Sequence, residues 1–173
     1  MHFRLCKRVC RKIAYRFTFF FGKIQNRIKV GERLKMNFLF CIEKYKMYTL
    51  FFDGCSKGNP GRGGAGAVLY KDDIELESYS LYLGNKVTNN FAEYSGLILG
   101  LENVNRLQIN SLHVKGDSLL VIRQMKGEYK VNATLKPLYQ RAKELTCKEI
   151  TFTHVFRAEN KRADQLSNDA ISM

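Results

Sequence analysis

The sequence lacks the marks of a disulfide-stapled, zinc-binding or membrane-spanning protein. Its five cysteines are odd in number and scattered, and no Cys-x-x-Cys pair is matched by a second pair of cysteines or histidines. This pattern argues against a disulfide framework and a zinc site, and it favours a reducing compartment inside the cell, whether cytoplasm, nucleus or organelle. Apolar stretches such as FTFFFG are too short to span a bilayer, and no small-residue cleavage site follows them. We therefore expect no membrane span and no secretory signal.

Internal repeats and low-complexity tracts are absent as well, so we expect a globular protein. With 173 residues, of which 45% are hydrophobic, the chain can bury one core and leave a short appendage. Residues 1–47 hold 13 Lys or Arg against two acids, a net charge of +11, whereas residues 48–173 hold 16 against 14, a net charge of +2. We therefore divide the chain into a basic N-terminal extension, residues 1–47, and a domain, residues 48–173.

The basic extension admits three interpretations. Clustered Lys and Arg could form a nucleic-acid-binding arm, because they neutralise phosphates and release counterions. A basic and acid-poor segment could also be an organelle-targeting leader, although this one contains no serine. The third interpretation is a poorly ordered segment without a function, translated from an upstream start, because Met36 and Met47 both lie just before the domain.

From Tyr48 onward the hydrophobic pattern predicts strands first and then alternating helices and strands. Turn residues separate the runs YTLFF, GAGAVLYKDD and IELESYSLYLGN, which is typical of an antiparallel meander. Apolar residues then recur at steps of three and four in NNFAEYSGLILGLENVNRL, which predicts an amphipathic helix capped by Asn89 or Asn90. Two more strands, SLHVKGDS and EITFTHVF, alternate with three more helices. We expect an α/β fold, with a five-stranded mixed sheet and helices packed on both faces.

The stretch TLFFDGCSKGNPGRGGAGAVLY ends an apolar strand on Asp53 and continues with several glycines and a proline. A carboxylate followed by a tight glycine-rich reversal suggests a site, because glycine permits backbone geometries and close approaches that other residues resist. A hairpin with a turn acid explains the same letters, since Asp is a common turn residue. The stretch alone leaves both interpretations open.

Three further acids lie near the end of a predicted strand or the start of a predicted helix. Glu93 falls in the first turns of the first helix, Asp117 follows the fourth strand, and Asp164 lies near the start of the last helix. Each one alone could cap a helix or complement its dipole. Together with Asp53 they can converge on one edge of the sheet, where their mutual repulsion would be costly without a cation. Mg²⁺, which prefers oxygen ligands and keeps several waters, suits such a cluster.

Four segments of the domain resemble, in order, the motif blocks of type 1 ribonuclease H: FFDGCSKGNPGRGGAGAVL, TNNFAEYSGLILGL, VKGDSLLVIRQMKGEYKV and HVFRAENKRADQLSN. The resemblance begins at residue 48 and leaves residues 1–47 unmatched. It implies the ribonuclease H-like fold and an endonuclease that hydrolyses the RNA strand of RNA/DNA hybrids, leaving 5′-phosphate and 3′-hydroxyl ends. Two Mg²⁺ ions would be the cofactors, with Mn²⁺ as an alternative.

The resemblance also assigns roles to the acids. Asp53 would bridge both metal ions, Glu93 and Asp117 would complete one metal site, and Asp164 would help to hold the other. Two cations about 3.5 to 4 Å apart can activate an attacking water and stabilise the departing 3′ oxygen, so no covalent intermediate is needed. His154, ten positions before Asp164, matches a family histidine thought to assist proton transfer or product release. A structural histidine that ends the last strand is the competing interpretation.

Substrate contacts carry over from the same blocks. Asn59, Asn89 and Asn90 match polar residues in the minor groove, where 2′-hydroxyl groups can identify the RNA strand. Thr88 matches a phosphate-binding position on the DNA strand. All four could also be plain turn and cap residues. Leu119 departs from the family, because some relatives carry a glutamine there.

The domain also lacks the basic protrusion that several relatives insert between the second and third helices. We hypothesise that the basic extension supplies the missing grip on the phosphates. An RNA/DNA hybrid is therefore the expected partner, double-stranded RNA is left open, and nothing in the sequence demands more than a monomer. A non-cleaving hybrid-binding module and another metal nuclease on the same fold, such as an integrase or a resolvase, remain the alternatives.

Overall fold

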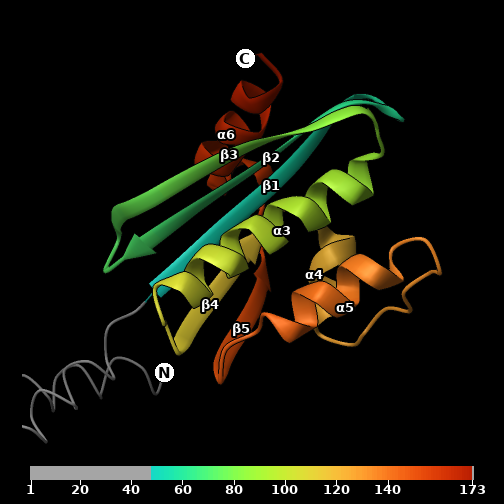
Figure 1. Cartoon of the computed structure of the whole chain (residues 1–173). Coiled ribbons are helices and arrows are strands. Elements are labelled where there is room, and N and C mark those ends of the chain that lie inside the picture. The colour runs from blue at the N-terminus through green and yellow to red at the C-terminus, as the bar shows by residue number, and fades with distance from the viewer. Residues whose placement is uncertain (1–47, 173) are drawn as a thin grey trace, which may run out of the picture. The chain divides into compact units, whose positions relative to one another are not determined.

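A computed structural model describes residues 48–172, which form an α/β domain (Figure 1). The predicted basic extension, residues 1–47, lies outside the described residues, so its three interpretations stay predictions. Within residues 48–172 no helix has the length and apolar character needed to cross a membrane. The elements follow in the order β1 Tyr48–Gly58, β2 Gly61–Lys71, β3 Ile74–Val87, α3 Asn89–Arg106, β4 Ser111–Gly116, α4 Leu119–Met125, α5 Lys136–Glu144, β5 Glu149–His154, a 3₁₀ turn Arg157–Glu159, and α6 Lys161–Ser172.

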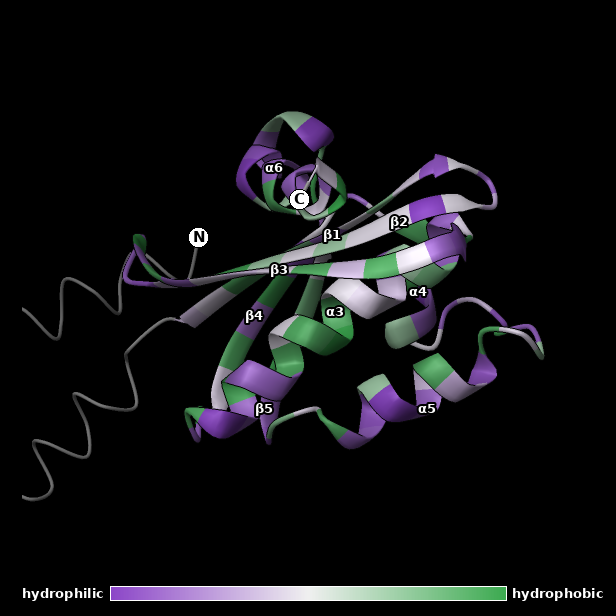
Figure 2. Cartoon of the chain, turned by 45° about the horizontal axis from the view of Figure 1, so that its top comes forward, coloured by the Kyte–Doolittle hydropathy of each residue, from purple (hydrophilic) through white to green (hydrophobic). Residues whose placement is uncertain are grey.

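The five strands form one mixed sheet in the spatial order β3-β2-β1-β4-β5. The first three strands are an antiparallel meander, and β4 and β5 add on the other side of β1, each parallel to its neighbour. Helices cover both faces, with α6 on one side and α3, α4 and α5 on the other (Figures 1 and 2). The predicted fold class, five-stranded mixed sheet and two-sided helix packing are confirmed.

The main hydrophobic core lies between the sheet and the helices α3, α4 and α5. Alternate residues of β1, Leu50 and Phe52, are fully buried there, because successive side chains of a strand point to opposite faces. Tyr94 and Leu97 of α3 pack into the same core at a helical spacing. The opposite face carries a smaller cluster under α6, formed by Val68, Ala163 and Leu166.

The glycine-rich stretch is mostly strand, which corrects the expectation that β1 ends at Asp53. β1 continues to Gly58, so Asp53 lies in its interior, and the reversal is confined to the residues around Asn59 and Pro60. The glycines are instead points of close backbone contact. A Cβ on Gly54 would lie 2.0 Å from the Ala92 carbonyl carbon in α3, and one on Gly64 would lie 2.1 Å from a carbonyl oxygen of α6. These glycines let both helices press directly on the sheet.

Candidate active site

Three carboxylates meet where the pairing of β1 with β4 ends: Asp53, Glu93 and Asp117. Each offers one oxygen, and these three oxygens lie within 4.8 Å of one another. Asp53 is 5% exposed and Glu93 is 7% exposed, while Asp117 is partly buried. The predicted convergence of these three acids is therefore observed, although their catalytic roles stay a proposal.

The three carboxylates come from adjoining elements. Asp53 is in β1, and Asp117 follows β4, which runs parallel to β1 and pairs with it up to the contact of Phe52 with Gly116. Glu93 is the fifth residue of α3. The missing side chain at Gly54 brings α3 close enough to place Glu93 beside Asp53, since a Cβ there would lie 2.2 Å from the Glu93 nitrogen.

Burial makes this cluster electrostatically unfavourable by itself. Desolvation raises the pKa of Asp53 from 3.8 to about 6, and the charges of Asp117 and Asp164 add to the rise, while a hydrogen bond from Ser167 opposes it. Desolvation and the neighbouring acids Asp53 and Asp117 raise the pKa of Glu93 well above its usual value.

One oxygen of the cluster also lacks a partner. Glu93 Oε2 is buried without a hydrogen bond, and a buried carboxylate oxygen in that state costs free energy. A divalent cation would satisfy this oxygen and relieve the repulsion, because Mg²⁺ takes carboxylate oxygens as ligands. The residues present therefore fit the divalent ions that the sequence implied.

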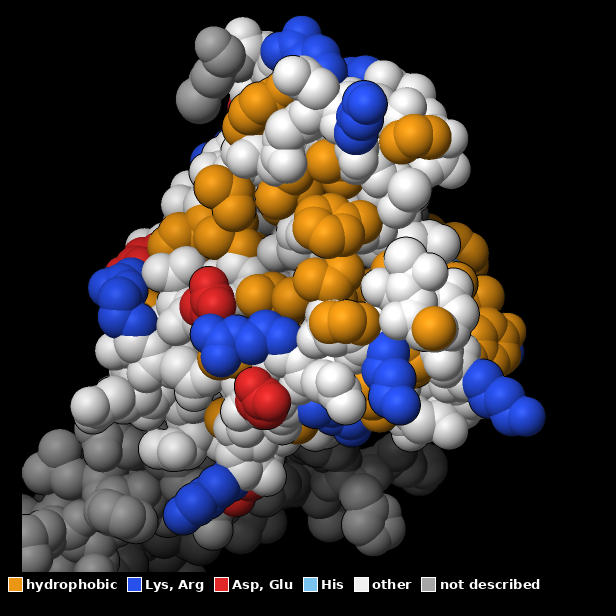
Figure 3. Space-filling model, turned by 45° about the vertical axis from the view of Figure 1, so that its right-hand side comes forward, with side chains coloured by type: hydrophobic (Ala, Val, Ile, Leu, Met, Phe, Trp, Pro, Cys, Tyr) orange, Lys and Arg blue, Asp and Glu red, His pale blue; other side chains and the backbone are white. Residues whose placement is uncertain are grey.

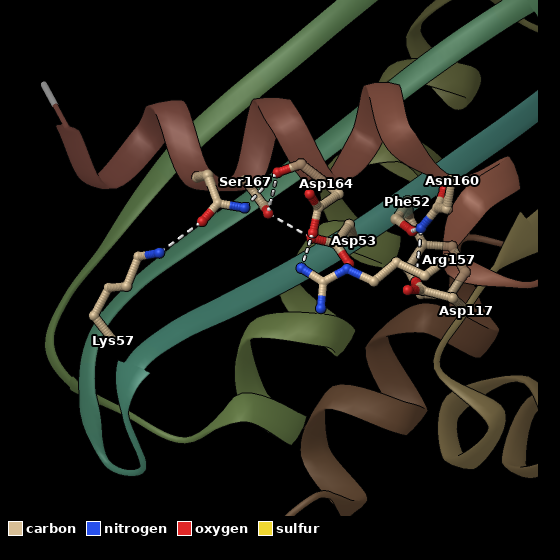
Figure 4. Close-up of polar contacts among 9 residues, drawn as sticks. Phe52, Asp53, Lys57, Asp117, Arg157, Asn160, Asp164 and Ser167 are labelled. Atoms are coloured by element: carbon tan, nitrogen blue, oxygen red, sulfur yellow. Dashed lines mark hydrogen bonds and ion pairs between the residues drawn. The ribbon is translucent and has the colours of Figure 1, made fainter.

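Asp164 does not join the three-carboxylate group. It lies in the first turn of α6 and forms an ion pair of 2.5 Å with Arg157, whose side chain is 77% exposed (Figure 4). The positive charge of Arg157 also lowers the pKa of Asp53 and of Glu93. Arg157 thus partly balances the negative charge of the acids, and sequence reasoning did not single out this residue.

Two buried polar residues hold the acids in place, and sequence reasoning missed both. Asn160, 1% exposed, donates from Nδ2 to Asp117 Oδ1 at 2.7 Å and to the Phe52 carbonyl oxygen at 2.9 Å (Figure 4). Ser167, fully buried in α6, donates from its hydroxyl to Asp53 Oδ2. The only sequence signal was the polar character of two positions in and before an amphipathic helix.

His154 is the last residue of β5 and lies beside Asp117, outside the three-carboxylate group. Its Nε2 bonds to the Asp117 carbonyl oxygen at 3.1 Å, so Nε2 carries the proton in this arrangement. The contact agrees with a structural role at the strand end, and the catalytic role of His154 stays a prediction. His113 lies inside β4, where its Nε2 contacts Thr153 Oγ1 at 2.9 Å.

The predicted substrate residues gather at the start of α3. Thr88, and not Asn89 or Asn90, is the N-cap, and its Oγ1 accepts from the Phe91 nitrogen at 3.3 Å. Asn59, in the turn after β1, accepts from the Asn89 nitrogen through Oδ1 at 3.1 Å. Asn90 is exposed beside them. The structure brings these four residues together, and their contacts with a substrate stay a prediction.

Comparison with known proteins shows the class of fold to which this domain belongs. The family described as Reverse transcriptase-like matches residues 51–170. LC11-RNase H1, whose structure was solved in complex with RNA/DNA hybrid, aligns with a TM-score of 0.68 and 35% sequence identity, over 72% of this chain and 96% of that one. The protein therefore has the ribonuclease H-like α/β fold.

Two relatives with similar sequences narrow the fold class to one protein family. A bifunctional protein of Mycobacterium tuberculosis is 42% identical over 123 residues, which are 69% of this chain and 34% of that protein. Ribonuclease HI of Halobacterium salinarum is 38% identical over 124 residues, 70% of this chain and 62% of that enzyme. The chain thus spans only part of the length of these relatives. It belongs to the type 1 ribonuclease H family.

Proposed function

We propose that this protein is an endoribonuclease that hydrolyses the RNA strand of RNA/DNA hybrids and leaves 5′-phosphate and 3′-hydroxyl ends. The observation that carries the proposal is the buried group of Asp53, Glu93 and Asp117, with one Glu93 oxygen unpartnered. Family membership supports the same activity. Neither a serine nor a cysteine nucleophile is required, because the attacking group is water.

Four residues would hold two divalent ions, Mg²⁺ or Mn²⁺. Asp53 would serve both ions, Glu93 and Asp117 would complete one site, and Asp164 would help to form the other after release from Arg157. When bound, such ions supply an activated water and charge stabilisation for the departing 3′ oxygen. The chain itself orients the carboxylates and excludes water beneath them, since Asp53 and Glu93 are buried.

The hybrid would enter along the edge where α3 begins. Asn59, Asn89 and Asn90 would contact the minor groove and its 2′-hydroxyl groups. Thr88, as the N-cap of the 18-residue α3, lies where helix N–H groups and the helix dipole favour a phosphate. This arrangement supports the proposed contact with the DNA strand, because one residue can cap the helix and bind a phosphate.

Two regions would bind the phosphates of the hybrid: the domain surface around the α4–α5 connection and the basic extension. The connection from α4 to α5 is short, residues 126–135, and has no helical protrusion. Its Tyr129 is exposed and stacks with Arg123, whose Nη1 donates to the Tyr129 hydroxyl at 2.8 Å. Figure 3 shows a face of the domain on which hydrophobic side chains gather, with Lys and Arg side chains around them. The basic extension, residues 1–47, would add the larger charge.

Cleavage of an end-labelled RNA/DNA hybrid in Mg²⁺ tests the proposal, beside double-stranded RNA, single-stranded RNA and duplex DNA. We expect cleavage of the RNA strand of the hybrid, no cleavage by Asp117→Asn, and wild-type cleavage by Asp169→Asn, a matched change at an exposed acid of α6. Binding of the hybrid without cleavage, in Mg²⁺ and in Mn²⁺, would instead identify a binding module.

A further inference from the structure

Ser167 is fully buried beside the three-carboxylate group. The resemblance to known motifs assigned no role to its hydroxyl. It lies in α6, one turn after Asp164, and its Oγ contacts two oxygen acceptors: Asp53 Oδ2 and the Asp164 carbonyl oxygen at 2.9 Å (Figure 4). Within residues 48–172, it is the one side chain that donates a hydrogen bond to the Asp53 carboxylate. The orientation of Asp53 therefore depends on this hydroxyl.

The single proton of Ser167 is available to Asp53. A hydroxyl donates one hydrogen bond at a time, and an ionised carboxylate is a stronger acceptor than a peptide carbonyl. Of the two competing acceptors, the Cys55 sulfur is a weak one, and the Asp164 carbonyl oxygen already receives a hydrogen bond from Asn168 Nδ2 at 2.8 Å. Asn168 thus satisfies that carbonyl and leaves the hydroxyl of Ser167 to the carboxylate.

Backbone packing fixes where the hydroxyl lies. A Cβ on Gly64 would lie 2.1 Å from the Ser167 carbonyl oxygen, and one on Gly66 would lie 2.5 Å from the Ser167 nitrogen. The main chain of Ser167 therefore rests directly on β2, next to the strand that carries Asp53. Gly66 is the register partner of Asp53 in the neighbouring strand. A side chain as short as serine, held this closely, has little freedom to move its oxygen away.

We propose that Ser167 is a positioning residue, whose hydroxyl fixes the Asp53 carboxylate and thereby sets the affinity of the cluster for a divalent cation. The inference rests on the proposed function, because Asp53 is taken as a metal ligand there. Groups that orient metal ligands through hydrogen bonds commonly change metal affinity or activity by about 10 to 100 fold when they are removed. Ser167 also joins Asp53 to the helix that carries Asp164.

Two substitutions test the hydroxyl. Ser167→Ala removes it and retains high helix propensity, and Ser167→Cys keeps a similar size with a weak donor. We expect both to raise the Kd for Mg²⁺ about tenfold in calorimetric titration without nucleic acid. The Mg²⁺ concentration for half-maximal cleavage should rise by the same factor, and saturating Mg²⁺ should restore most of kcat.

Ser172→Ala is the matched control, because Ser172 is an exposed serine of the same helix, and its hydroxyl donates to the Asn168 carbonyl oxygen at 3.3 Å. It should bind Mg²⁺ as the wild type does. The Tm of each variant in EDTA separates folding from metal binding. If wild type binds Mg²⁺ and both Ser167 variants bind it with the same Kd, the inference is wrong and the proposed function stands. If wild type binds neither Mg²⁺ nor Mn²⁺, the proposed function fails, and the inference fails with it.

Discussion

Asn160 joins Asp117 to the backbone of β1 through one side-chain amide. Its Nδ2 donates to Asp117 Oδ1 at 2.7 Å and to the Phe52 carbonyl oxygen at 2.9 Å. Phe52 precedes Asp53, so this amide fixes two of the three clustered acids relative to each other. Asn160 is 1% exposed, which leaves water little access to replace these bonds.

Asn160→Ala should therefore weaken both the fold and the site. The Phe52 carbonyl oxygen and Asp117 Oδ1 would each lose the hydrogen bond that Asn160 donates, which costs about 1 to 3 kcal/mol of the free energy of unfolding. Urea denaturation measures this loss, and Mg²⁺ titration measures the loss of order at Asp117. Asn110→Ala, a change at an exposed asparagine, serves as the control. Wild-type stability and wild-type Mg²⁺ affinity in Asn160→Ala would contradict the assigned role.

The buried carboxylate of Asp53 should make the metal-free protein sensitive to pH. Its pKa rises from 3.8 to about 6 because burial disfavours the charged form. The folded chain therefore holds a proton that the unfolded chain has released between these two values, so stability falls as pH rises through this window. Above pH 6 the destabilisation is complete, and below pH 3.8 it is absent.

A comparison with Asp53→Asn isolates this contribution. In EDTA, the variant should gain stability relative to wild type as the pH rises from 3.8 to 6. Urea midpoints at several pH values within that window provide the measurement. A difference between variant and wild type that stays constant with pH would show that burial does not raise the pKa of Asp53.

Divalent cations should stabilise the folded protein through the same cluster. At neutral pH the wild type in EDTA carries repelling buried carboxylates, and bound Mg²⁺ stabilises by mass action, about 2.7 kcal/mol at a concentration 100 times Kd. The Tm should therefore rise with Mg²⁺ in the wild type and much less in Glu93→Gln. An equal rise in both proteins would place the stabilising cation elsewhere.

Position 54 should not tolerate a side chain, because Gly54 packs directly against the backbone of α3. In Gly54→Ala the new Cβ would lie 2.0 Å from the Ala92 carbonyl carbon, so the helix would have to move. Overpacking of this kind costs about 1 to 3 kcal/mol. Displacement of α3 should also carry Glu93 away from Asp53 and weaken Mg²⁺ binding. Unfolding and Mg²⁺ titrations check both effects, and a variant with wild-type values in each would contradict the close contact.

The basic extension, residues 1–47, should act on binding and leave the chemical step unchanged. Its removal should raise KM for the hybrid and leave kcat nearly the same, because phosphate contacts supply affinity without positioning the metal ligands. Each lost phosphate contact should reduce the slope of log affinity against log salt by about 0.9 on duplex DNA. Steady-state kinetics over a range of salt concentrations would show this, whereas an unchanged KM and salt slope would exclude the arm interpretation.

The sequence was sufficient to predict the element order and the mixed sheet, and three of the four acids expected to converge do so, whereas Asp164 lies outside their group. Periodicity located α3 and the strands, and the motif blocks located Asp53, Glu93 and Asp117. Asp53 was nevertheless expected at a strand end, because glycines normally mark turns. In this fold Gly54 and Gly64 instead mark where helices touch strands, and that contact involves residues far apart in the chain.

The residues that hold the acids could not be found in the same way. Asn160 contacts Phe52 across 108 positions, and Ser167 contacts Asp53 across 114 positions. No local pattern encodes such pairs, and each residue alone is typical of a turn or of a helix surface. Arg157 was missed for a related reason, because its ion pair with Asp164 depends on the 3₁₀ turn that begins at Arg157 and leads into α6.

Residues 157–167, which run from the 3₁₀ turn into α6, include Arg157, Asn160, Asp164 and Ser167. These residues meet acids supplied by β1 and β4 only when α6 is seated on Gly64 and Gly66. A partly folded chain in which α6 has detached would retain most of the main core. Its clustered carboxylates, however, would lose the hydrogen bonds that position them and the positive charge of Arg157. Under the proposed function, cleavage of nucleic acid would therefore require that α6 is packed on β2.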